Sequence, residues 1–121
     1  MASLKNYAIS LLGSKAAVAM TNGGGPTTLF TTPVGKTTYI THAVVRSASA
    51  TLVSGTAYTI TGMGSAFSLS ALTTATTGFV VVAPASTIQR QLVAEATAVV
   101  LTTTTGSGTA TATIDVFGYT V

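Results

Sequence analysis

Short segments rich in Thr and Val, separated by Gly and Pro, are the feature of this sequence that most constrains its fold. Threonine supplies 26 of the 121 residues, and β-branched side chains favour the extended backbone of a strand. Such segments at close spacing are typical of an antiparallel sandwich or barrel. Only residues 88–98 have a helix-tolerant composition, and at most one helical turn is expected there. The predicted fold is all-β, with candidate strands at residues 27–32, 36–47, 57–61, 79–83, 94–103 and 109–119.

Charged side chains are unusually scarce in this chain. Five cations and two acids are the only charged residues, whereas an ordinary soluble domain is about a quarter charged. An apolar fraction of 47% and a mean hydropathy of +0.63 exclude the composition of a disordered chain. A folded domain with so little surface charge is prone to associate. We therefore expect that other protein covers much of its surface, as in an assembly component.

The residue types that carry most enzyme and metal chemistry are nearly absent. His42 is the only histidine, Glu95 and Asp115 are the only acids, and there is no Cys. These residues are too few for a metal site, and no nucleophile-elbow motif accompanies them. Residues 35–38, Gly-Lys-Thr-Thr, imitate a phosphate-binding loop, but Phe30 stands where that motif requires its first Gly. The sequence predicts no catalytic residues, no cofactor and no metal.

The charge distribution also argues against nucleic acid as a partner. The net charge is +3, but the cations Lys5, Lys15, Lys36, Arg46 and Arg90 are dispersed and form no cluster. No stretch reaches the roughly 18 continuous apolar residues of a membrane helix. We therefore expect neither a nucleic acid nor a membrane partner.

A glycine-rich segment at residues 21–26, Thr-Asn-Gly-Gly-Gly-Pro, divides the chain. It predicts an N-terminal arm over residues 1–22, a linker over residues 23–26 and a β domain over residues 27–121. The arm would become ordered against a neighbouring protein. The equal alternative is that residues 1–20 form a first strand of the same domain. The predicted contact residues of the arm are Leu4, Tyr7, Ile9, Leu11 and Leu12.

Side-chain alternation predicts which way the last strand faces. Even positions from Ala110 to Val116 are apolar, and the odd positions from 109 to 113 are all Thr. The even face should line the core, which places Phe117 and Tyr119 on the outer face as a contact patch. The alternative is a β-bulge near Gly118 that reverses the alternation and buries both aromatic rings.

The segment from Lys36 to Arg46 has apolar residues on both faces. Alternation places Tyr39, Ala43 and Val45 on one face, and Ile40 and Val44 on the other with the polar residues Lys36, His42 and Arg46. A strand that is apolar on both sides is either central in a sandwich or buried by a partner.

Two segments carry a resemblance to a known family. Residues 28–50, which include Thr-Pro-Val-Gly-Lys-Thr-Thr-Tyr-Ile, and residues 110–119, which include Ile-Asp-Val-Phe-Gly-Tyr, are similar to segments of small all-β virion proteins of tailed bacteriophages. The resemblance covers about residues 27–61 and 94–121, and Ser47 stands where the family usually has Asn. It implies a jelly-roll-like antiparallel sandwich that is often a trimer on the outer capsid surface, or the head module of a fibre.

Composition and resemblance together lead to one expected function. We expect a non-enzymatic capsid decoration or cement protein on the outer capsid surface, with the major capsid protein and copies of itself, as a homotrimer, for partners. One alternative is a tail or fibre module that binds a host surface. Another is a secreted carbohydrate- or ice-binding β domain, although the Thr-rich runs share no common period.

Overall fold

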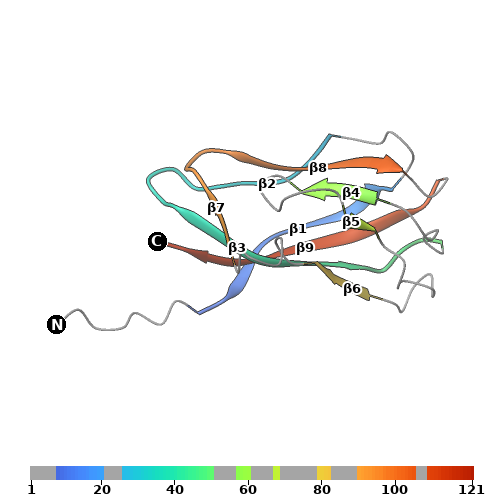
Figure 1. The fold of residues 1–121 in the computed structure, drawn as a ribbon, viewed down its shortest axis with the longest axis horizontal. Coiled ribbons are helices and arrows are strands. Elements are labelled where there is room, and N and C mark those ends of the chain that lie inside the picture. Colours follow the sequence, from blue (N-terminus) through green and yellow to red (C-terminus); the bar gives the residue numbers. More distant parts are fainter. Residues whose placement is uncertain are drawn as a thin grey trace.

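The computed structural model describes residues 8–20, 26–50, 57–60, 67–68, 79–82, 90–105 and 109–121. These residues form antiparallel strands and no helix (Figure 1), so the predicted all-β class is confirmed. The strands are β1 (Ser10–Ala19), β2 (Thr27–Thr31), β3 (Thr38–Arg46), β4 (Ala57–Ile60), β5 (Phe67–Ser68), β6 (Phe79–Val82), β7 (Gln91–Val93), β8 (Ala98–Thr105) and β9 (Thr111–Thr120).

The strands are arranged in two sheets that pack against each other like a sandwich. One sheet has the order β1-β9-β3-β6, with β7 also paired to β3, and the other has the order β2-β8-β4-β5. In Figure 1 strands β2, β4 and β8 lie above, and β3, β6 and β9 lie below. One hydrophobic core joins the sheets, because it contains Ile40 and Ile114 from the first and Val99 and Leu101 from the second. The jelly-roll connectivity remains a prediction.

Residues 10–19 form an edge strand of the larger sheet and pair along β9. Val18 and Met20 are buried in the core, and the Met20 amide donates a 2.9 Å hydrogen bond to the carbonyl of Ala110. The structure therefore agrees with the alternative that these residues form a first strand of the domain. Over residues 10–19 it does not show the detached arm that was predicted for residues 1–22. Two irregularities, at Leu11/Gly13 and between Lys15 and Val18, interrupt the pairing. They explain why the segment shows no two-residue period.

The alternation predicted for β9 is confirmed. Ala110, Ala112, Ile114 and Val116 are all at most 2% exposed. Phe117 and Tyr119 are half-buried, and β9 pairs with β3 on both sides of Gly118 without an extra residue in β9. The bulge considered near Gly118 is therefore absent from this strand.

The bulge lies instead in β3, between Ile40 and His42. It places Ile40, Ala43 and Val45 together in the core, and it brings Tyr39 and His42 to the outer face. The sequence prediction that grouped Tyr39 with Ala43 and Val45, and Ile40 with His42, was therefore wrong. One extra residue shifts the two-residue period, and nothing in the local sequence marks where it occurs.

Candidate functional site

The outer face of the larger sheet carries two rows of large side chains. Directly paired residues of neighbouring antiparallel strands point to the same side. The pairing therefore aligns one row across β7, β3 and β9 and a second row across β3, β9 and β1. We call these six residues the aromatic face: Leu92, Tyr39 and Tyr119 in the first row, and His42, Phe117 and Leu11 in the second.

The rings within each row are stacked on one another. The Tyr39 and Tyr119 centroids lie 5.2 Å apart with an angle of 26° between the rings, and the His42 and Phe117 centroids lie 4.8 Å apart at 8°. These separations are close to the roughly 4.8 Å spacing of strands in a sheet. The stacks therefore run across the strands, so the ring faces cover one another and the ring edges are directed outward. Leu92 and Leu11, at the ends of the rows, are each 53% exposed.

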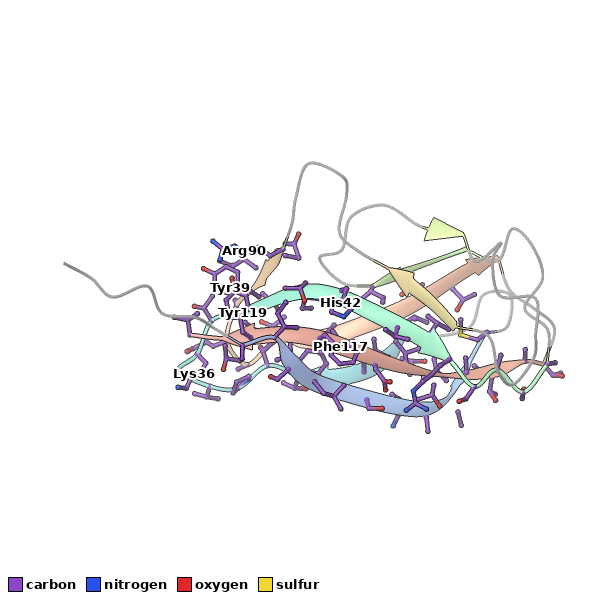
Figure 2. All side chains as sticks on the ribbon, turned by 90° about the horizontal axis from the view of Figure 1, so that it is seen from below. Lys36, Tyr39, His42, Arg90, Phe117 and Tyr119 are labelled. Atoms are coloured by element: carbon purple, nitrogen blue, oxygen red, sulfur yellow. The ribbon has the colours of Figure 1, made fainter. Side chains whose placement is uncertain are left out.

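Arg90, just before β7, packs against the central ring of the first row, Tyr39. Its guanidinium carbon lies 4.3 Å from the centroid of the Tyr39 ring, and its Nη1 donates a hydrogen bond to the Tyr119 hydroxyl. Figure 2 shows these three residues together near one end of the sheet, with His42 and Phe117 further along it. The hydrogen bond to Tyr119 raises the pKa of Arg90 above its ordinary value. The Arg90 guanidinium is therefore positively charged at neutral pH.

The bulge residue Thr41 holds the second row in position. Its hydroxyl donates to the carbonyl of Phe117 over 3.2 Å and lies 3.0 Å from Nδ1 of His42. A hydroxyl has one hydrogen to donate. Because the Phe117 carbonyl takes this hydrogen, the contact with His42 is satisfied when Nδ1–H donates to the Thr41 oxygen. This arrangement fixes the imidazole plane against the Phe117 ring.

Further along the same face, Asp115 forms a compact polar cluster. It accepts hydrogen bonds from Ser14 over 2.5 Å and from Nε of Arg46 over 2.7 Å. Burial opposes ionisation and by itself raises the pKa of Asp115, but the hydrogen bonds from Arg46 and Ser14 and the Arg46 charge outweigh it. The net pKa of Asp115 is therefore lowered. The carboxylate is 8% exposed, so this cluster joins β1, β9 and β3 and does not offer a free acid.

The other acid, Glu95, ties two turns together. Its Oε2 accepts a 2.7 Å hydrogen bond from the amide of Gly35 in the turn between β2 and β3. Beside it, the Thr32 hydroxyl donates to the carbonyl of Ala94 over 2.6 Å, and the Thr97 amide donates to the Thr32 oxygen over 2.8 Å. Glu95 therefore has a structural role at the end of the sandwich. The other acidic side chain, Asp115, is bound to Arg46 and Ser14, so the two acids do not form a pair.

The predicted contact residues have different positions in the structure. Leu4 and Tyr7 lie outside the described residues, and Ile9 is 56% exposed next to the start of β1. Leu11, Phe117 and Tyr119 lie together on the aromatic face. Leu12 does not join them, because it packs against the core and comes close to Gly118.

Four residues of the site were not found from the sequence. Tyr39 and His42 were assigned to opposite faces because the bulge is not visible in the sequence. Arg90 and Leu92 belong to residues 88–98, for which the composition predicts at most one helical turn, and this segment contains the strand β7. Leu92 is exposed and Val93 is buried, but both are apolar, so the sequence shows no two-residue alternation that would predict this strand.

Two further features of the described residues concern metal binding and membrane-spanning helices. In the described part of the chain, no three His, Cys, Asp or Glu side chains are close enough to hold a metal ion together. The same residues include no helix with the length and apolarity to cross a membrane. No protein-family model matches this chain, and no curated protein or solved structure shows significant similarity to it. The function therefore has to be inferred from the residues and geometry of the chain itself.

Proposed function

We propose that this protein is a non-enzymatic assembly component that attaches to another protein through the aromatic face. The observation that carries the proposal is the pair of stacked rows, each ending in a half-exposed leucine, on a chain with only seven charged residues. Protein interfaces are depleted in charge at their centre and enriched in aromatic residues and Arg. Large side chains held in fixed positions also lose little conformational freedom when they are buried.

The direction of the rings favours a protein partner over a carbohydrate. A sugar ring packs its C–H face against an open aromatic face, and the stacks leave mainly ring edges directed outward. Edges of stacked rings, together with Leu11 and Leu92, instead suit the irregular apolar side chains of a protein surface.

The described threonines give little support to ice binding. Thr102 is exposed in β8 of the smaller sheet, whereas Thr111 and Thr113 are half-buried in β9 of the larger sheet. These residues therefore lie in two different layers and do not form one flat array. The run at residues 73–77 lies outside the described residues.

We place this attachment in a bacteriophage particle because of the resemblance carried by residues 28–50 and 110–119. The protein then acts as a capsid decoration protein, a homotrimer bound to the major capsid protein on the outer surface of the shell. A tail or fibre module is the second candidate. Both positions use the same face, and they differ in which virion protein lies against it.

The test uses purified particles that lack this protein. A mass-spectrometric inventory of complete virions first establishes whether the protein is present, and recombinant protein is then added back to the depleted particles. The double variant Leu11→Ser/Leu92→Ser should reduce affinity at least about tenfold, since each lost contact removes an exposed apolar anchor. The control Val34→Ser removes a side chain that is 77% exposed in the turn between β2 and β3 and is not one of the six residues of the aromatic face, so it should bind like the wild type. Equal losses for both variants, or no loss for either, would contradict the proposal.

A further inference from the structure

Arg90 is a charged residue on a face that the proposed function buries. Its side chain is held against the Tyr39 ring and hydrogen-bonded to the Tyr119 hydroxyl, as Figure 2 shows for the three residues. A guanidinium has five N–H donors, and within the part of the chain that the structure describes Arg90 donates to one acceptor, the Tyr119 oxygen. The remaining donors are therefore positioned before any partner arrives, and Arg90 itself is exposed.

The chain supplies no acidic side chain for this cation. Its two acids are Glu95 and Asp115. Asp115 is buried and bound to Arg46 and Ser14, in the one ion pair that the described residues contain. Glu95 accepts the Gly35 amide in the turn between β2 and β3. Docking of the aromatic face would therefore desolvate the Arg90 charge without any acid from this chain to neutralise it.

An unpaired charge buried at an interface is strongly unfavourable, whereas a paired and hydrogen-bonded one is tolerated. We infer that the partner is a protein of different sequence, whose apolar docking surface carries an Asp or Glu carboxylate that binds Arg90. The planar guanidinium, fixed by Tyr39 and Tyr119, offers the two parallel donors that a carboxylate accepts. This inference rests on the proposed function, and it makes Arg90 the residue that selects the partner and its orientation.

A second copy of this chain fits the face less well. Its Asp115 is buried, and its Glu95 carboxylate is held in the turn by the Gly35 amide through Oε2. The trimer interface of the proposed function is therefore expected to lie elsewhere on the molecule. The variant Glu95→Gln tests this point, because it removes the only exposed acidic side chain that a second copy could offer.

The experiment measures binding of the full chain to particles that lack it, with three substitutions at Arg90. Arg90→Gln should weaken binding about tenfold or more, and Arg90→Glu about a hundredfold, because hydrogen bonds to a charged group are worth that range. Arg90→Lys should retain part of the affinity, since it keeps the charge but loses the paired donors. Wild-type binding should weaken slightly as sodium chloride rises, as expected for a single ion pair, and Arg90→Gln should lose this dependence. Thermal unfolding of each variant checks that the exposed substitution leaves the fold intact.

The outcomes separate this inference from the proposed function. If Leu11→Ser/Leu92→Ser loses binding and Arg90→Glu has no effect, the inferred partner carboxylate is wrong, but the proposed attachment through the aromatic face is supported. If Glu95→Gln weakens particle binding as much as Arg90→Gln does, the acid belongs to a second copy and the inference is wrong. Absence of wild-type binding to the particles would overturn both. Rescue of Arg90→Glu by an Asp or Glu to Lys change in the shell protein would identify the acid directly.

Discussion

Replacing Gly118 by Ala should destabilise the domain more than any other substitution of one small residue that we can derive from the structure. Gly118 lies in β9 between Ile40 of β3 and Ser10 of β1. A Cβ at this position would lie 1.9 Å from the backbone oxygen of Tyr39 and 2.9 Å from Cδ1 of Leu12. Leu12 can change its rotamer, but a backbone oxygen cannot move without its strand. Overpacking that side chains can absorb costs about 1–3 kcal/mol, so we expect about 3–4 kcal/mol here.

Urea unfolding gives the free energy of unfolding of the variant against two controls. Gly35 has a φ of +75° and nothing within 4 Å of its would-be Cβ, so Gly35→Ala carries only the left-handed backbone penalty of about 1–2 kcal/mol. Gly13→Ala places its Cβ 2.7 Å from Cβ and Cγ of Phe30, and its cost should be intermediate because a side chain, and no backbone oxygen, stands in the way. A Gly118→Ala variant within about 1 kcal/mol of the wild type would refute the close approach of β9 and β3 at the bulge, and with it the alignment of the aromatic rows.

Three further predictions concern the fold, its acid sensitivity and its assembly. Deletion of residues 1–20 removes β1 with the buried Val18 and Met20, so circular dichroism should show no cooperative unfolding. A truncated protein that still folds would instead support the interpretation of residues 1–22 as a detached arm. The folded-state pKa of Asp115 is lowered, so its contribution is present above the unfolded value of about 4 and is lost as pH falls through the folded value. Asp115→Asn should therefore lower the free energy of unfolding by about 1–2 kcal/mol at pH 7, and the variant should lose less stability than the wild type when the pH falls. Urea unfolding of both proteins at pH 7 and pH 3 measures these two effects. An equal loss of stability on acidification in the two proteins would contradict the prediction. Sedimentation of dilute protein should show a trimer that Arg90→Glu leaves intact, and a stable soluble monomer would contradict the trimer.

The parts of the fold that follow a regular period could be predicted from the sequence. The apolar and threonine positions of β9 alternate without interruption, and the core face they define is the one observed. In β3 and β1 the pairing contains bulges, and the positive φ of Ala17 lies within the second irregularity of β1. A bulge shifts every following side chain to the other face, and the residues around it have no distinctive composition. The faces of β3 and the status of β1 therefore required the pairing itself.

The same reason limits how much of the site could be predicted. Phe117 and Tyr119 follow from the alternation of β9 alone. Their stacking partners come from β3, and Arg90 reaches Tyr39 only because β7 pairs with the first residues of β3. Such contacts depend on which strands are neighbours in the sheet. Neighbouring strands can be far apart in the sequence, so the pattern within one segment does not reveal its partner. The scarcity of charge, in contrast, is a property of composition, and the expectation of an assembly component rests on it.

An electron cryomicroscopy map of the purified virion tests the central claim most directly, because it shows which face of this domain meets another protein. The outer face of the β1-β9-β3 sheet should lie against a protein of the shell, with Tyr39, Phe117 and Tyr119 covered and an acidic side chain beside Arg90. A bound domain that turns this face to solvent, or a virion without density for this protein, would contradict the account.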